Sequence, residues 1–198
     1  ALLLNIIVSL IAFWQFYRGG YFKWKLFLPF VITSIPAAFI GSWINLDTIL
    51  YKQILGVLLL FPILRLLGFL GKEHEQTREV NIPVALLIGV GIGFLSGMIG
   101  IGGGIILSPL LLLLHWGKMK ETAAVSALFI FVNSLSGFVA LLTKGVEIDM
   151  LIWLWLGIAV AGGLTGAYLG RRKLNNKVLK AMLASVLVIA SIKLLTVK

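Results

Sequence analysis

The sequence contains no cysteine and only two histidines among its 198 residues. Without cysteine, the chain can form neither disulfide bonds nor thiolate metal sites. The two histidines, His74 and His115, lie far apart along the chain and in different surroundings. We therefore expect neither a metal site nor a cofactor.

Charged side chains are also scarce. They make up 12% of the sequence, whereas soluble domains carry about 25%. Hydrophobic residues account for 60%, and the mean hydropathy is +1.08. Residues 82–115 and 123–143 contain no charged side chain, and apolar runs of about 18 residues or more are typical of membrane-spanning helices. The sequence therefore predicts an all-α membrane protein, a polytopic helical bundle that crosses the cell membrane several times.

Acidic residues are the scarcest charged type, with seven Asp and Glu against seventeen Lys and Arg. A net charge of +10 could indicate a nucleic-acid-binding protein, but these basic residues lie in short loops between apolar runs. In that position they indicate membrane orientation and contacts with anionic lipid head groups. We expect the lipid bilayer, and not nucleic acid, to be the partner. A homo-oligomer is compatible with the sequence.

Seven apolar segments follow one another along the chain. They cover residues 1–17, 26–44, 49–70, 82–115, 123–143, 148–170 and 178–197. The fourth is too long for one span, because a continuous helix would measure about 50 Å against a hydrocarbon core of about 30 Å. Three consecutive glycines, Gly102 to Gly104, disfavour a helix in its middle. We expect a re-entrant segment, in which one helix enters, the chain bends at the glycines, and a shorter helix returns.

The distribution of Lys and Arg favours this re-entrant arrangement. If the fourth segment returns to its own side, twelve basic residues lie on one side of the membrane and four on the other. If it crosses once, each side carries eight. The positive-inside rule therefore places the loops 18–25, 71–81, 117–121 and 171–180 together in the cytoplasm.

An internal repeat becomes visible when the sequence is displaced by 128 positions against itself. The aligned pairs include Asn5 with Asn133, Lys52 with Lys180, Ala38 with Gly166 and Ser42 with Gly170. The repeat predicts a first half over residues 1–70, which lacks its initial glycine-rich segment, a linker over 71–81 and a second half over 82–198. Together with the loop charges it predicts two inverted repeats, an arrangement common in secondary transporters.

Four motifs give the chain a resemblance to a known family. They read GFLSGMIGIGGG at 93–104, SPL at 108–110, TAAVS at 122–126 and NSLSG at 133–137. Together they resemble the sulfite exporter TauE/SafE family, over essentially the whole chain. The resemblance implies a bundle of two similar halves that exports sulfite, sulfonates or related organosulfur anions. The chain departs from the family pattern in lacking the first copy of the glycine motif.

The glycine break is the first candidate for a substrate-binding site. The predicted binding residues there are Gly100, Gly102, Gly103 and Gly104. Glycines allow backbone N–H groups to turn inward, and the half-helix that follows presents its positive end, so both features favour an anion. The alternative is close helix packing, which we expect for the spaced glycines at 89, 93 and 97 and at 162, 166 and 170.

Three polar side chains within the apolar segments are further candidates for substrate binding. Asn133 and its repeat partner Asn5 could each donate a hydrogen bond to an anion or, equally, bond a neighbouring helix. Ser126 lies two helical turns before Asn133 on roughly the same face and could join the site. Its alternative is a hydroxyl that bonds the backbone of its own helix.

These features favour a secondary transporter that exports small organosulfur anions across the cytoplasmic membrane. The alternatives are a structural or assembly subunit of a membrane complex and a membrane-embedded anion channel. An enzyme is not expected, because the apolar segments contain no paired nucleophile and base and no cluster of metal ligands. The sequence does not identify the anion or the coupling ion.

Overall fold

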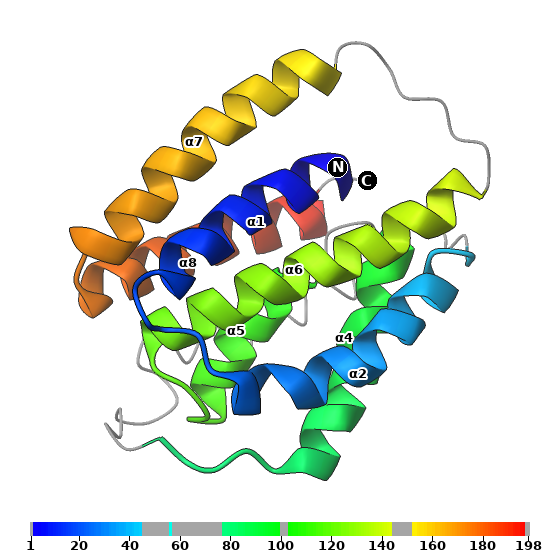
Figure 1. Ribbon diagram of the computed structural model, residues 1–198, viewed down its shortest axis with the longest axis horizontal. Helices are drawn as coiled ribbons and strands as arrows, with labels where there is room; N and C mark the ends of the chain where they lie inside the picture. Colours follow the sequence, from blue (N-terminus) through cyan, green and yellow to red (C-terminus); the bar gives the residue numbers. More distant parts are fainter. Residues whose placement is uncertain (1, 45–55, 57–76, 100–102, 144–151, 197–198) are drawn as a thin grey trace.

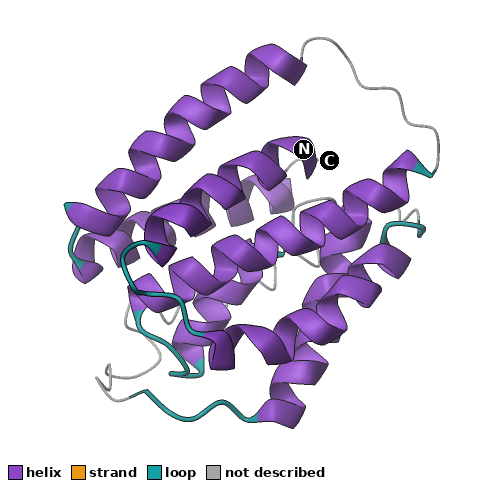
Figure 2. Ribbon diagram, viewed as in Figure 1, coloured by secondary structure: helices purple, strands orange, loops and turns teal. Residues whose placement is uncertain are grey.

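A computed structural model describes residues 2–44, 56, 77–99, 103–143 and 152–196. Within these ranges the chain forms helices and no strand, joined where described by short loops (Figure 2). The helices are α1 (Leu2–Tyr17), α2 (Trp24–Gly41), α4 (Ile82–Ile99), α5 (Gly104–Leu113), α6 (Met119–Leu142), α7 (Ile152–Arg172) and α8 (Asn176–Thr196). The predicted all-α fold is thus confirmed.

The helices pack side by side as a bundle (Figure 1). Helix α6 is its centre, because it contacts α1, α2, α4, α5 and α8. Helix α1 also contacts α7, and α2 also contacts α4. The first predicted half of the chain is therefore packed directly against the second.

The main hydrophobic core lies between α2, α4, α5 and α6. Its fully buried members include Phe30, Leu107, Leu111 and Phe129. The outward faces are apolar as well: Leu87 on α4 is 74% exposed and Ile189 on α8 is 66% exposed. Large exposed apolar surfaces of this kind fit a lipid environment. Three helices, α2, α6 and α8, are long and apolar enough to cross a membrane.

Helices α2 and α4 approach each other at the level of their backbones. A Cβ added at Gly93 would lie 2.5 Å from Ser34 Cα, and one added at Gly97 would lie 2.7 Å from the Ala38 carbonyl carbon. The hydroxyl of Thr33 donates to the carbonyl oxygen of Leu86 at 2.8 Å across the same interface. The close packing expected for the glycine face at 89, 93 and 97 is therefore present, with α2 as the partner.

The glycine face at 162, 166 and 170 on α7 has fewer close neighbours than the face on α4. A Cβ at Gly162 or Gly166 would meet no atom within 4 Å in the part of the chain that the structure describes. At Gly170 it would make ordinary contacts with Phe16 and Leu179, at 3.6 and 3.7 Å. The expected close packing is thus not found for this face within the described residues.

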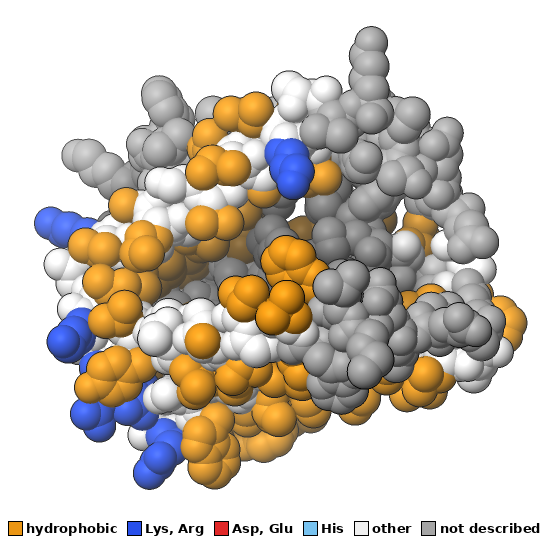
Figure 3. All heavy atoms as spheres, turned by 90° about the horizontal axis from the view of Figure 1, so that it is seen from above, with side chains coloured by type: hydrophobic (Ala, Val, Ile, Leu, Met, Phe, Trp, Pro, Cys, Tyr) orange, Lys and Arg blue, Asp and Glu red, His pale blue; other side chains and the backbone are white. Residues whose placement is uncertain are grey.

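Among the described residues, the Lys and Arg side chains visible in Figure 3 lie mostly at one end of the bundle. Hydrogen bonds and an ion pair connect the helix ends there. Lys23, before α2, forms an ion pair with Glu121 of α6 at 2.7 Å, while Lys120 donates to the Arg171 carbonyl oxygen at the end of α7. Arg171 in turn donates to the Gln15 carbonyl oxygen near the end of α1. The end of α1, the starts of α2 and α6 and the end of α7 therefore lie together.

The start of α4 and the end of α5 are also connected. The backbone N–H of Arg78, shortly before α4, donates to the carbonyl oxygen of His115, just after α5, at 2.7 Å. Asn81 caps α4, because its side-chain oxygen accepts the Val84 N–H at 3.3 Å. The residues just before α4 and just after α5 therefore lie next to each other.

Candidate substrate site

The glycine break separates α4 from α5. Gly103 is the N-cap of α5 and adopts a left-handed conformation, with φ of 69° and ψ of −12°. Side chains with a Cβ rarely adopt this conformation, so the position favours glycine. Its carbonyl oxygen accepts the N–H groups of Ile106 and Leu107 at 3.1 and 3.2 Å, which starts the helix. Gly100 and Gly102 lie outside the described residues.

Both described glycines of the break are tightly surrounded. A Cβ at Gly103 would lie 2.8 Å from Ile92 of α4 and 3.1 Å from the ring of Phe129 of α6. A Cβ at Gly104 would collide with Ile130 and lie 3.2 Å from the carbonyl oxygen of Ser126. The first turn of α5 is therefore packed closely against α6, as the packing alternative expects.

The backbone carbonyl group of Ser126 lies beside this turn. Its side chain is buried, with 3% exposure, and its hydroxyl has no hydrogen-bond partner among the described residues. The alternative in which this hydroxyl bonds its own helix is therefore not what the structure has. The hydroxyl is free to donate, because a serine O–H rotates to suit its acceptor.

Asn133 lies two turns further along α6 and is 1% exposed. Its side-chain amide donates to the carbonyl oxygen of Phe129 at 2.9 Å, within its own helix. Its side-chain oxygen has no partner within the described ranges. The observed bond is intrahelical, so the interhelical hydrogen bond expected as the alternative is not the one that the described residues form. One amide proton of Asn133 is still available to a ligand.

Asn5 is half-buried on α1, the helix that packs along α6. Asn5 is not among the atoms that a Cβ at Gly103 or Gly104, the described glycines of the break, would meet. Two buried serines were not singled out by sequence reasoning. Ser96 of α4 lies 3.1 Å from a Cβ at Gly103, and Ser134 of α6 is fully buried with an unpartnered hydroxyl. Both serines belong to motifs that carry the family resemblance, at 93–104 and 133–137. Their position in these motifs is the feature by which the sequence could have identified them.

The electrostatics of the break favour an anion. The first N–H groups of an α-helix have no acceptor within the helix, and they carry about half a positive charge together. At α5 this end is surrounded by Ile92, Phe129 and Ile130, so the local dielectric is low. The first turn of α5 therefore presents backbone N–H groups in an apolar environment. No three His, Asp or Glu side chains come together in the described ranges to hold a metal.

The fold and this region define the class of protein: an all-helical membrane protein in which α6 carries buried polar groups that have no partner among the described residues. A model of the family described as sulfite exporter TauE/SafE matches residues 1–194, and the chain belongs to that family of membrane transporters.

Curated relatives agree with this assignment. The chain is similar to the probable membrane transporter protein y4hK of Sinorhizobium fredii, with 31% identity over 98% of this chain and 81% of the relative. A probable membrane transporter protein of Methanocaldococcus jannaschii is 26% identical over 94% of this chain and 74% of its own length. The probable membrane transporter protein YunE of Bacillus subtilis is 29% identical over 63% of this chain and 45% of its own length. No solved structure matches the chain.

Proposed function

We propose that this transporter exports small organosulfur anions, such as sulfite or sulfonates, from the cytoplasm across the cytoplasmic membrane. The family description supports sulfite or a chemically related anion as the substrate. Two observations carry the proposal: the N-terminal turn of α5 packs against the backbone of Ser126 in α6, and the buried hydroxyl of Ser126 has no hydrogen-bond partner among the described residues.

The chemistry of this contact suits a small oxyanion. A sulfite or sulfonate group has three oxygens that accept hydrogen bonds and a charge that is costly to bury unpaired. Backbone N–H groups of α5 and the Ser126 hydroxyl supply donors without adding a full positive charge. The anion can therefore bind reversibly, as a transport cycle requires. Asn133 lies on the same face of α6 and is assigned to the same path.

The proposed topology places the basic end of the bundle in the cytoplasm. There the positive-inside rule is satisfied by Lys and Arg on several neighbouring helix ends. The hydrogen bond between Arg78 and His115 supports a re-entrant α4–α5 segment, since both of its ends lie on this side. Helix α5 has ten residues and extends about 15 Å, roughly half the hydrocarbon thickness, so its N-terminus would lie at membrane depth.

Two inverted repeats are the proposed origin of this arrangement. The displacement of 128 residues maps Trp24, the first residue of α2, onto Ile152, the first residue of α7. It also maps α1 onto the second half of α6. Helix α2 starts at the basic end whereas α7 finishes there, so the two run in opposite directions. The contacts agree with a pseudo-two-fold axis, because α1 packs on α7 and, equivalently, α6 packs on α2.

Efflux from proteoliposomes tests the transport proposal. Vesicles are loaded with sulfite, and its release is compared with that of chloride, with rates normalised to folded protein. We expect sulfite release to saturate, and Ser126→Ala to raise the half-saturating concentration about tenfold, because a hydrogen bond to a charged group contributes about 1.5–3 kcal/mol. Ser9→Ala is the matched control: Ser9 is equally buried, but its hydroxyl already bonds the Ile6 carbonyl oxygen.

Two results would contradict the transport proposal. One is the same sulfite efflux for Ser126→Ala as for wild type, which would remove the hydroxyl from the site. The other is equal release of sulfite and chloride, which would show that the protein does not select sulfite.

Topology is tested separately with single introduced cysteines, which are the only labelled thiols because the native sequence contains no cysteine. Arg78→Cys and Lys118→Cys should both be protected from a membrane-impermeant reagent added outside cells.

A further inference from the structure

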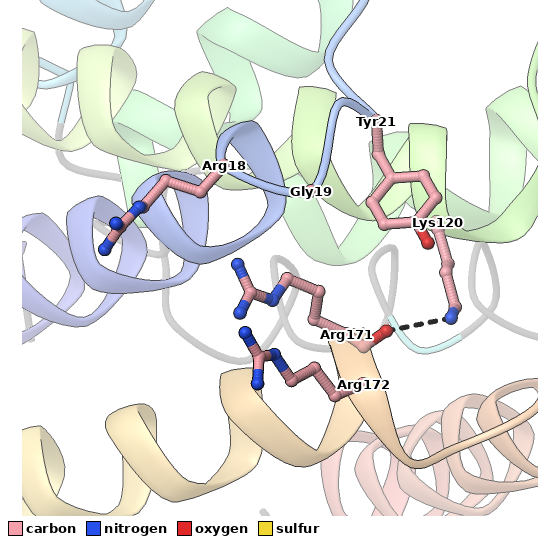
Figure 4. Close-up of a pocket in the computed structure, with 6 residues that line it drawn as sticks. All are labelled: Arg18, Gly19, Tyr21, Lys120, Arg171 and Arg172. Carbon is pink, nitrogen blue, oxygen red and sulfur yellow. Dashed lines mark hydrogen bonds between the residues drawn. The ribbon is translucent and has the colours of Figure 1, made fainter.

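A pocket of about 410 Å³ opens at the basic end of the bundle, where the end of α1, the start of α6 and the end of α7 meet (Figure 4). Its lining residues are Arg18, Gly19, Tyr21, Lys120, Arg171 and Arg172. Four of these six side chains are cationic. The pocket shares no residue with the glycine break.

The positive charge of this pocket is not neutralised by carboxylates of the described chain. Glu79 and Glu121 are the two acidic residues in the described ranges. Glu121 is already engaged, because it pairs with Lys23 at 2.7 Å and accepts the Lys118 N–H at 3.0 Å. Neither carboxylate lines the pocket. A cluster of like charges held together in this way is electrostatically unfavourable unless an anion joins it.

Several contacts hold the cations in place. Lys120 donates to the Arg171 carbonyl oxygen at 2.9 Å and lies 5.4 Å from the centre of the Tyr21 ring. Arg171 donates from one terminal nitrogen to the Gln15 carbonyl oxygen at 3.1 Å, and Arg172 lies over the Tyr168 ring at 5.6 Å. The site is therefore largely formed before any ligand arrives, which lowers the entropic cost of binding.

One donor in the pocket is buried without a partner. The Nε atom of Arg171 is inaccessible to solvent and has no acceptor among the described residues. A buried N–H of a charged group left unpaired costs free energy. An anionic oxygen at this point would satisfy it.

Exposed apolar side chains lie within about one helical turn of the pocket-lining residues at the ends of α1 and α7. Trp14 and Tyr17 precede Arg18 on α1 and are 58% and 48% exposed, and Leu169 of α7 is 41% exposed. A ligand bound to the cations could thus lay hydrocarbon against α1 and α7. Phosphate is the oxyanion that clustered Arg and Lys groups bind well, and the apolar flank distinguishes a lipid from a free ion.

We propose that this pocket binds the phosphate of an anionic phospholipid at the cytoplasmic surface, with Arg171, Arg172 and Lys120 as its ligands. The bound lipid would join α1, α6 and α7 at this end. The proposal is independent of which anion is transported. It makes the stability of the transporter depend on the head-group composition of the membrane.

Titration of a short-chain phosphatidylglycerol into the protein in detergent tests this proposal, with the rise in Tm as the readout of binding. Phosphatidylcholine of the same chain length serves as the zwitterionic reference. We expect phosphatidylglycerol to raise the Tm at concentrations at least about tenfold lower than phosphatidylcholine, and Arg172→Gln to remove that difference. Lys173→Gln is the matched control, because it removes the same charge from the neighbouring residue, which does not line the pocket.

Gly19→Ala provides a variant without any change of charge. Its Cβ would lie 2.7 Å from the Tyr21 ring and 3.2 Å from Arg171 Cδ, so it narrows the pocket and should weaken phosphatidylglycerol binding. If Arg172→Gln and Lys173→Gln weaken phosphatidylglycerol binding equally, the lipid responds to the general surface charge and not to this pocket, and the proposal is overturned. Inorganic phosphate that raises the Tm at the same concentrations as the lipid would overturn the lipid assignment. We expect Arg172→Gln to leave sulfite efflux unchanged, so a loss of lipid binding can be distinguished from a defect in the transport site.

Discussion

Helices α4 and α7 carry glycines at the same four-residue spacing, yet only one of these faces is covered in the described structure. On α4, Gly93 touches the backbone of Ser34, and Thr33 donates to Leu86 across the interface. On α7, a Cβ added at Gly166 would meet no atom of another described element within 4 Å, and the Thr165 hydroxyl bonds Ala161 of its own helix at 2.9 Å. Spaced glycines therefore permit close approach, but they do not determine whether a partner is present.

The largest effect is expected from Gly93→Val, which should strongly reduce the yield of folded protein. The new Cβ would meet Ser34 Cα at 2.5 Å, and a backbone contact cannot be relieved by a side-chain rotation. Overpacking typically costs about 1–3 kcal/mol and more where the backbone must move. Size-exclusion chromatography and Tm in detergent measure this effect.

Gly91→Ala is the control for Gly93→Val on the same helix. A Cβ at Gly91 has no atom within 4 Å among the described residues, so this variant should fold like wild type. Normal folding of Gly93→Val would mean that α2 and α4 do not touch as described.

A smaller effect is expected from Gly103→Ala, which should lower both the Tm and the rate of sulfite efflux. The left-handed conformation costs about 1–2 kcal/mol for a residue with a Cβ, and contacts with Ile92 and Phe129 add to this cost. Gly20 has a similar φ of 73° but no atom within 4 Å, so Gly20→Ala carries the backbone cost alone. If Gly103→Ala and Gly20→Ala lower the Tm equally, the packing around Gly103 does not contribute to the effect.

Thr33→Val should lower the Tm modestly. The substitution keeps the shape of the side chain but removes its hydrogen bond to Leu86, and such bonds between membrane helices contribute about 0.6 kcal/mol on average. Thr165→Val on α7 removes a hydroxyl that bonds only its own helix, so its Tm should stay at the wild-type value. Parallel thermal melts of the two variants measure the difference between the interfaces directly.

The smallest effect is expected from Gly166→Ala, with a change in stability within about 0.5 kcal/mol. This expectation corrects the one drawn from sequence, in which Gly166 belongs to a packing face. If Gly166→Ala lowers the Tm as much as Gly93→Ala does, another segment or molecule covers this face of α7. Thermal melts at several protein concentrations would then separate a second copy of the chain from an intramolecular contact.

The sequence predicts the helices well, because long uncharged runs have few alternatives in a membrane. It also identifies the interruption before α5, since glycines at 102–104 disfavour a helix. The side-chain chemistry at the site is less predictable. Whether Ser126 bonds its own helix depends on its rotamer and on the turn of α5 pressed against it, and neither is encoded locally. The same holds for Asn133, whose amide bonds Phe129.

The inverted repeat stays a prediction that several contacts support. It rests on a few matched residues and on helix directions, whereas residues 45–55 and 57–76, which would complete the first half, lie outside the described ranges. Pairings between distant helices depend on the topology of the whole bundle. Local spacing alone could not reveal that α2 is the partner of Gly93 or that Gly166 has no described partner.

The backbone contact between α2 and α4 has a mechanical consequence. Two helices that touch without intervening long side chains have no soft layer between them to absorb sliding, and Thr33 and Ser42 fasten them at two further points. We expect α2 and α4 to move together as one rigid body during any conformational cycle. Any change of shape during a transport cycle must then occur between this pair and the helices around it, of which α6 contacts both members.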